Sequence, residues 1–169
     1  MPVTPPKKSD NTMAEKEKIP FVDLYAQYLS IKEDIDKAIA TTIQQSSYIG
    51  GKAVKDFETT FASFLGIKEV IACANGTDSI EILLKAMGVG PGDEVIVPAI
   101  SWISTSEAVS AVGARPVFVD IDEKSFCIDT DKIETAITAR TKAIIPVHLY
   151  GHPANMPRVM AIANKHKLL

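Results

Sequence analysis

Gly76, Thr77 and Asp78 are the first residues of this chain whose types and spacing could do chemistry. They follow a short apolar run and stand where an amphipathic helix is expected to begin. The first N–H groups of a helix lack partners inside the helix and lie at the positive end of its dipole, which suits a phosphate. Gly76 lets such a group approach the backbone, and Thr77 adds a hydroxyl. A plain helix cap is the alternative interpretation, because Asn, Thr and Asp all cap helices well.

Trp102 is the single tryptophan of the chain and follows a second apolar run, Glu94–Val97. An indole at this place offers a rigid face for stacking on a heteroaromatic ring. The alternative is a tryptophan of the core or of an interface. Open α/β sheets bind ligands at the carboxyl ends of their strands, which favours the first interpretation. A phosphate-binding helix start and an aromatic side chain at the ends of adjacent strands predict a flat phosphorylated cofactor.

His148 and His152 flank a short loop after a further apolar run. Gly151 and Pro153 exclude a helical i, i+4 pair of metal ligands, and no third ligand is evident, so we expect no metal site. His148 alone, at a strand end, is a candidate neighbour of substrate or cofactor. A structural histidine is the equal alternative.

Tyr48 precedes Gly50-Gly51 and is a candidate substrate-binding residue, with loop packing as the alternative. Asp120 and Asp122 could form a carboxylate pair. A solvated turn is the favoured interpretation, because Asp is common in such turns.

The composition is that of an ordinary globular protein. The chain has 169 residues, 46% hydrophobic and 23% charged, with a net charge of −3. This balance does not favour a nucleic-acid or membrane surface, and no apolar run reaches the ~20 residues that span a bilayer. The two cysteines stand in unrelated contexts, so we expect free thiols and a cytoplasmic protein.

These candidates require strands and helices that alternate. We expect strands at Glu69–Cys73, Glu94–Val97, Pro116–Val119 and Ala143–Val147. We expect helices at Ala26–Gln44, Ser79–Met87, Ile103–Val112, Asp131–Ala136 and Asn155–His166, with a further one over Val54–Leu65 that Gly66 ends. Such alternation predicts an α/β fold with a mostly parallel sheet.

Three segments differ in character. Residues 1–18 are polar and rich in lysine and predict a disordered tail. Residues 19–66 predict a helical segment, and residues 67–169 predict the sheet-bearing domain. The last residues begin another apolar run, so we expect the sheet to be incomplete at this end.

Several long motifs resemble the DegT/StrS family of sugar aminotransferases, a branch of the fold-type-I pyridoxal-phosphate enzymes. They occur in the family's order: PFVDLYAQY, SYIGGKAVKDFE, ANGTDSIEILLKA, GVGPGDEVIVPAISWISTSEAV, GARPVFVDID and TKAIIPVHLYGHPANM. The resemblance implies the amino-terminal half of the large domain of such an enzyme. It also implies that Gly76, Thr77 and Asp78 hold the phosphate of pyridoxal 5'-phosphate, that Trp102 stacks on its ring, and that His148 lies near the active-site floor.

The family transfers an amino group, usually from glutamate, to a keto carbon of a nucleotide-linked deoxysugar, and acts as a homodimer. Its aspartate that pairs with the pyridine nitrogen and its Schiff-base lysine have no counterpart among these residues. We therefore expect no transaminase activity from the chain alone and assign it no catalytic residue. A non-catalytic remnant or partner subunit, and a dehydratase-type relative, are the alternatives.

Overall fold

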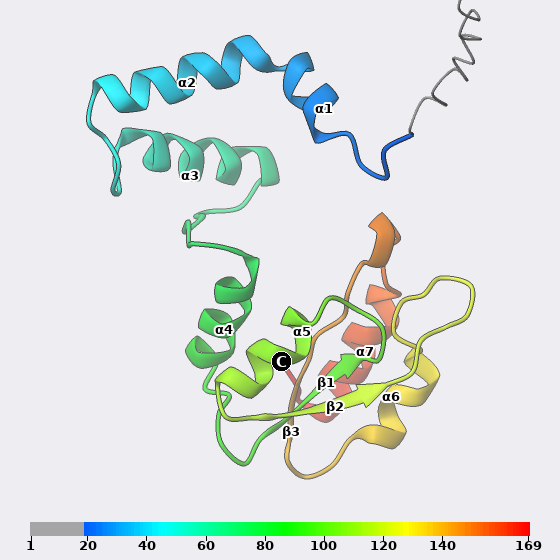
Figure 1. Ribbon diagram of the computed structural model, residues 1–169. Coiled ribbons are helices and arrows are strands. Elements are labelled where there is room, and N and C mark those ends of the chain that lie inside the picture. Colours follow the sequence, from blue (N-terminus) through cyan, green and yellow to red (C-terminus); the bar gives the residue numbers. More distant parts are fainter. Residues whose placement is uncertain (1–18) are drawn as a thin grey trace, which may run out of the picture. The chain divides into compact units, whose positions relative to one another are not determined.

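The computed structural model describes residues 19–169 (Figure 1). The predicted disordered tail at 1–18 lies outside them. The chain divides into two compact units, Met1–Val70 and Ile71–Leu169. The segments expected from the sequence, 19–66 and 67–169, stay predictions. Each unit is described by itself.

The described part of the first unit consists of three helices, α1 (Leu24–Ser30), α2 (Lys32–Gln44) and α3 (Lys52–Leu65). The prediction of one continuous helix over Ala26–Gln44 is wrong, because Ile31 has φ −128° and ψ 17° and separates α1 from α2. Its N–H bonds to the Tyr28 carbonyl in a tightened last turn, and the Ser30 hydroxyl bonds back to Gln27. Such local bonds compete with the regular helical ladder.

The end of α3 follows the sequence prediction. Gly66 adopts φ 67° and ψ 29°, the left-handed conformation in which glycine carries no steric penalty. Its N–H bonds back to the last turn of α3, which satisfies carbonyl groups that have no partner further along the helix. Gly66 therefore ends this helix as a C-terminal cap.

The second unit alternates helices and parallel strands. In chain order its elements are α4 (Gly76–Ala86), β1 (Glu94–Pro98), α5 (Ser104–Ala111), β2 (Arg115–Val119), α6 (Thr130–Ala136), β3 (Thr141–Ile144), the short 3₁₀ helix η1 (Leu149–Gly151) and α7 (Met156–His166). The sheet has the order β2-β1-β3, and β1 pairs in parallel with both neighbours. The carboxyl ends of its three strands therefore lie at one edge. The predicted α/β class with a parallel sheet is confirmed.

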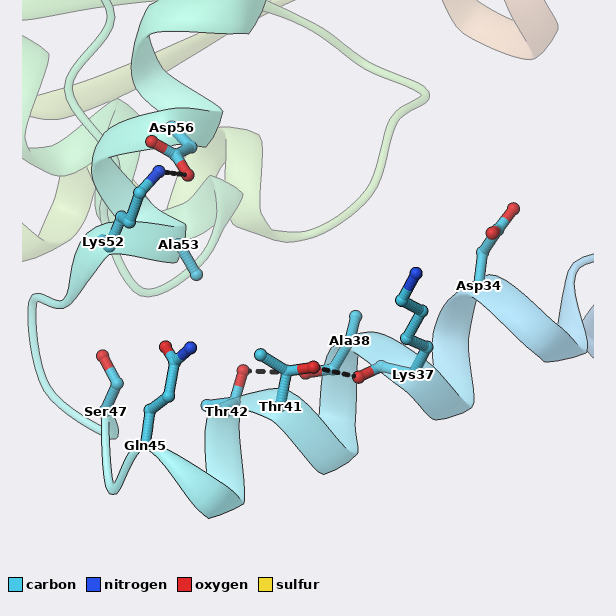
Figure 2. A pocket seen from close by; sticks show the side chains of 10 residues that line it. All are labelled: Asp34, Lys37, Ala38, Thr41, Thr42, Gln45, Ser47, Lys52, Ala53 and Asp56. Atoms are coloured by element: carbon cyan, nitrogen blue, oxygen red, sulfur yellow. Dashed lines mark hydrogen bonds and ion pairs between the residues drawn. The ribbon is translucent and has the colours of Figure 1, made fainter.

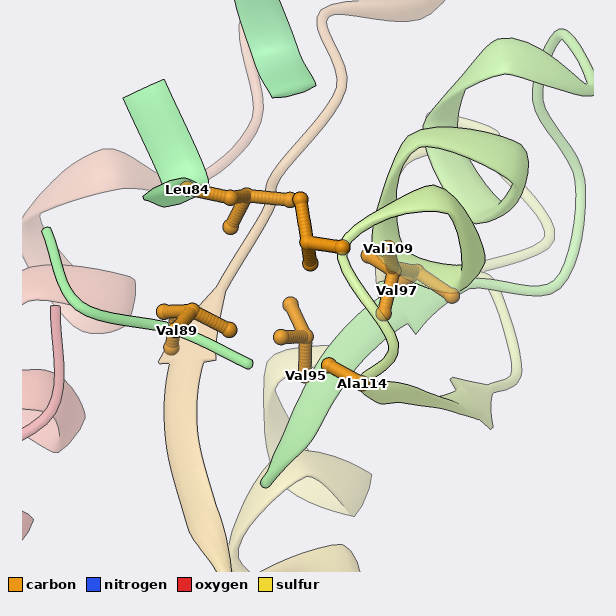
Figure 3. Packing of buried hydrophobic residues seen from close by; sticks show 8 residues of the cluster. Leu84, Val89, Val95, Val97, Val109 and Ala114 are labelled. Atoms are coloured by element: carbon orange, nitrogen blue, oxygen red, sulfur yellow. The ribbon is translucent and has the colours of Figure 1, made fainter. Parts of the chain in front are cut away.

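Alternate residues of β1 pack into two cores on opposite faces of the sheet. Val95 and Val97 are fully buried on the face that Leu84 of α4 and Val109 of α5 cover (Figure 3). Ile96 points to the other face, against α6 and α7; that core contains Ile96, Val119, Ile128, Ile133, Ile144, Val159, Ile162 and Ala163. Because both faces are covered, β1 is apolar at consecutive positions, as the sequence pattern indicated.

Besides the divided helix of the first unit, the expected elements are present with small shifts, with one exception. The expected strand Glu69–Cys73 is wrong: these residues form no strand, and Ile71 is 84% exposed. An apolar run becomes a strand only when a neighbouring strand takes its hydrogen bonds, and the three-stranded sheet of the described residues does not extend to this segment. The third strand also begins at Thr141 rather than Ala143, although Ile145 still donates to the Ile96 carbonyl at 2.9 Å.

Glu94 begins β1 at the edge opposite the strand carboxyl ends and is only 2% exposed. Its carboxylate accepts from the Thr138 hydroxyl at 2.5 Å and from Arg140 Nη2 at 2.7 Å. These hydrogen bonds, the one from Thr138 first, lower the pKa of Glu94. Thr138 and Arg140 therefore hold the segment before β3 against the start of β1.

Within residues 19–169, no helix combines the length and the apolar character that crossing a bilayer requires.

Candidate functional site

The candidate phosphate seat is the first turn of α4. Asn75 caps this helix: its side-chain Oδ1 accepts the Asp78 N–H at 2.9 Å. Gly76 and Thr77 are the first two helical residues, and the structure pairs neither N–H with an acceptor among the described residues. Because the cap uses the Asp78 N–H, a bound anion meets first the N–H groups of Gly76 and Thr77. A contribution from Asp78 stays a prediction and requires the cap bond to open.

A hydrogen bond joins this seat to the start of α5. The Thr77 hydroxyl donates to Ser104 Oγ at 2.8 Å, across 27 positions of sequence. Ser104 is the first residue of α5 and stands two positions after Trp102. The bond therefore brings the amino-terminal ends of two helices together beside the tryptophan loop. Both ends carry the positive pole of a helix dipole.

Trp102 leaves the carboxyl end of β1 on a braced loop. Its carbonyl accepts the Thr105 N–H at 3.1 Å, and the hydroxyls of Ser101 and Thr105 lie 2.9 Å apart. The indole is 78% exposed, so its faces are not used by the core. A hollow of about 130 Å³ adjoins it and is also lined by Phe118 of β2. A fixed loop and an uncovered ring are what a stacking platform requires.

His148 follows β3 and lies beyond the same edge of the sheet as Trp102. Its Nδ1 accepts the Ala154 N–H at 3.0 Å, which fixes the orientation of the ring and leaves Nε2 as the other polar atom. Within residues 71–169, no hydrogen bond or ring contact joins His148 to Trp102. Tyr48 belongs to the first unit, in the loop between α2 and α3, and is 67% exposed. Both substrate assignments stay predictions.

Asp120 and Asp122 form the solvated turn that the sequence favoured. Asp122 Oδ1 accepts the N–H and the hydroxyl of Ser125, at 2.8 and 2.9 Å, and these bonds lower the pKa of Asp122. The Ile121 N–H and then Lys132 lower the pKa of Asp120. Each carboxylate therefore has its own local partners and stays ionised, which is not the shared-proton arrangement of a catalytic pair.

Four exposed lysines of the second unit, Lys85, Lys142, Lys165 and Lys167, do not take the place of the family's Schiff-base lysine. Lys85 pairs with Glu81 at 2.6 Å within α4, and Lys165 pairs with Glu134 at 2.7 Å. Lys167 adopts φ 56° just after α7, and Lys142 is exposed on β3. None of these four side chains lines the hollow beside Trp102.

A second hollow lies within the first unit, between α2 and α3. It has a volume of about 390 Å³, and the residues that line it include Lys37, Thr41 and Gln45 (Figure 2). Lys52 and Asp56 on its α3 side are ion-paired with each other. The hollow contains none of the predicted site residues.

Three residues near the seat were not predicted from the sequence. Ser104 was one hydroxyl among several in the Ser-Trp-Ile-Ser-Thr-Ser run, and its position at a helix start beside Trp102 was the available signal. Cys73 precedes the seat in the sequence and Ser79 follows it, and their side chains are 2.8 Å apart. No sequence signal marked that contact.

The family model for DegT/DnrJ/EryC1/StrS aminotransferases matches residues 29–169. The chain is 46% identical over 156 residues to a UDP-N-acetyl-3-dehydro-alpha-D-glucosamine 3-aminotransferase of Acidithiobacillus ferrooxidans, covering 92% of this chain and 42% of the relative. It is 47% identical over 148 residues to a UDP-2-acetamido-2-deoxy-3-oxo-D-glucuronate aminotransferase of Pseudomonas aeruginosa, covering 88% and 41%. The chain thus spans about two fifths of the length of these relatives.

Solved structures agree with the sequence relatives. DesV of S. venezuelae, in complex with a ketimine intermediate, superposes with a TM-score of 0.86 at 41% identity, covering 89% of this chain and 40% of DesV. NtdA of Bacillus subtilis, with bound cofactor PMP, superposes with a TM-score of 0.85 at 43% identity, covering 89% and 35%. Aminotransferases of this family depend on pyridoxal phosphate. With the family match extending over most of its length, this chain belongs to the DegT/DnrJ/EryC1/StrS aminotransferase family.

Proposed function

We propose that this chain forms the phosphate-binding and ring-stacking side of the cofactor site in a pyridoxal-phosphate-dependent aminotransferase. The whole enzyme would transfer an amino group, with glutamate as donor, to a keto carbon of a nucleotide-linked deoxysugar. The observation that carries the proposal is the Thr77–Ser104 hydrogen bond, which links the phosphate seat to the loop of Trp102.

The residues present fit the cofactor. Two backbone N–H groups without partners in the described structure, at Gly76 and Thr77, match a dianionic phosphate at a helix start. A Cβ placed on Gly76 would meet nothing within 4 Å, so the space above the seat is open. Trp102 presents an uncovered indole beside it, as a pyridine ring requires.

When bound, pyridoxal phosphate supplies an electron sink for the carbanion that amino-group transfer generates. The residues of this chain anchor and orient it. Gly76 and Thr77 donate to the phosphate, and the braced loop of Trp102 holds the indole against one face of the ring. His148 and Tyr48 are proposed to contact the substrate.

Fluorescence of the purified 169-residue chain tests the binding part of this proposal. Trp102 is its only tryptophan, so indole emission reports a single position. We expect pyridoxamine phosphate to quench that emission saturably, inorganic phosphate to compete, and pyridoxamine without the phosphate to bind more weakly. Emission that pyridoxamine phosphate leaves unchanged would contradict the proposal.

A second assay addresses catalysis by the chain alone. We expect no glutamate-dependent amination of a keto-sugar nucleotide, because the four lysines considered above do not line the hollow beside Trp102. Turnover by the purified chain would show that another group replaces the Schiff-base lysine.

We also propose that the whole enzyme is a cytoplasmic homodimer. Both cysteines of the chain are free thiols, which fits a reducing compartment. Phe57, Phe61 and Phe64 form a stacked, exposed row along α3, and a row of this kind fits burial in an assembly. Light scattering of the whole enzyme tests the dimer.

A further inference from the structure

Two side chains converge on the Asn75 carbonyl, next to the phosphate seat. The Ser79 hydroxyl donates to this carbonyl at 3.0 Å, and the Cys73 thiol donates to it at 3.5 Å. Ser79 Oγ and Cys73 Sγ lie 2.8 Å apart.

The Asn75 carbonyl is held from more than one direction. The Ser79 N–H donates to it at 3.1 Å, in addition to the Ser79 hydroxyl, and Cys73 Sγ lies 3.5 Å away. These contacts differ from the cap proper, in which the Asn75 side chain accepts the Asp78 N–H. The side-chain cap fixes the helix start, whereas the second set fixes one peptide plane.

That peptide plane carries the first donor of the seat. The Asn75 carbonyl and the Gly76 N–H belong to the same trans peptide, so they point in opposite directions and rotate together. A carbonyl fixed toward the helix fixes the Gly76 N–H outward, toward the position of the phosphate. Because the Ser79 hydroxyl and the Cys73 thiol both donate to this carbonyl, they add to the hold on its orientation.

We propose that Cys73 and Ser79 are positioning residues of the cofactor site, which orient the Gly76 N–H toward the phosphate without touching the cofactor. This inference rests on the proposed function of the seat. It assigns to the hydroxyl of Ser79 and the thiol of Cys73 a contribution to phosphate affinity in particular, separate from ring stacking and from helix stability.

Removal of the Ser79 hydroxyl tests the proposal. In the purified chain, Ser79→Ala weakens the binding of pyridoxamine phosphate by about fivefold, the factor expected from one hydrogen bond of ordinary net strength. The affinity for pyridoxamine, which has no phosphate, stays unchanged. Ser79→Thr keeps the hydroxyl and restores the affinity. Cys73→Ser keeps the donor, whereas Cys73→Ala removes it and weakens phosphate binding in the same sense as Ser79→Ala.

Ser110→Ala is the matched control. Ser110 Oγ makes the same i to i−4 bond, to the Ser106 carbonyl at 3.2 Å, but lies near the carboxyl end of α5. Ser110→Ala and Ser79→Ala should lower the melting temperature to a similar extent. Only Ser79→Ala should change the ratio of the affinities for pyridoxamine phosphate and pyridoxamine.

The outcomes separate the two proposals. If the unmodified chain binds pyridoxamine phosphate and Ser79→Ala binds it equally well, the positioning role is wrong and the proposed function stands. If Ser79→Ala loses affinity for both ligands equally, the hydroxyl is merely structural and the positioning role is again wrong. If the unmodified chain binds neither ligand, the proposed function is wrong, and this inference is overturned with it.

Discussion

The cap at Asn75 allows stability and phosphate binding to be separated by two substitutions at one position. Asn75→Ala removes the acceptor of the Asp78 N–H and leaves a first-turn donor of α4 without a protein partner. The bond is 2.9 Å long and exposed, so water replaces part of it. The loss of an N-cap of this kind costs about 1 kcal/mol of unfolding free energy. For a unit of this size, the melting temperature should fall by about 4 °C.

Asn75→Asp keeps the acceptor and adds a negative charge at the positive end of the helix. The charge stabilises the helix by about 0.3–1 kcal/mol, and repulsion from the Asp78 carboxylate offsets part of this. We therefore expect a melting temperature close to that of the unmodified chain. The same charge repels a bound phosphate, so pyridoxamine phosphate should bind about fivefold more weakly while pyridoxamine is unaffected.

Two measurements test the effects expected of Asn75→Ala and Asn75→Asp. Thermal unfolding followed by circular dichroism gives the stabilities, and titration followed by Trp102 emission gives the affinities. An unchanged melting temperature in Asn75→Ala would refute the cap as an energetic element. Undiminished affinity for pyridoxamine phosphate in Asn75→Asp would refute the location of the phosphate at the start of α4.

Three further substitutions test the core, the stacking platform and the buried carboxylate. Leu84→Ala should lower the unfolding free energy by about 3 kcal/mol in urea titrations, because Leu84 is 2% exposed in the core beneath α4. Trp102→Ala should weaken cofactor binding by roughly 1–2 kcal/mol in calorimetry, through the loss of stacking. Glu94→Gln should make the unfolding free energy depend less steeply on pH in the acidic range. The lowered pKa of Glu94 gives stability that is present above its ordinary pKa of 4.5 and lost as the pH falls through the folded value.

Each of these has a control. Leu83 is adjacent in sequence but 57% exposed, so Leu83→Ala should cost under ~0.5 kcal/mol, and an equal loss at both positions would contradict the described core. Ile100→Ala, in the same loop as Trp102, should leave cofactor affinity unchanged; full affinity in Trp102→Ala would remove the indole from the site. If the unfolding free energy of Glu94→Gln depends on acidic pH as steeply as that of the unmodified chain, other carboxylates cause the dependence.

The sequence by itself determined the elements whose signals are local. The alternation of strands and helices and the left-handed glycine that ends α3 depend on residues a few positions apart. The family resemblance was likewise readable from contiguous motifs, and residues 29–169 confirm it. Local signals suffice where a residue acts on its own helix turn or strand.

Tertiary structure decided what depends on partners far along the chain. Residues 69–73 have the apolar pattern of a strand, but a strand requires a neighbour for its hydrogen bonds, and the sheet does not extend to them. The Thr77–Ser104 bond spans 27 positions, and the burial of Glu94 depends on Arg140, 46 positions away. Hydrogen-bond geometry between such residues is set by how helices pack on the sheet, which no short window of sequence encodes.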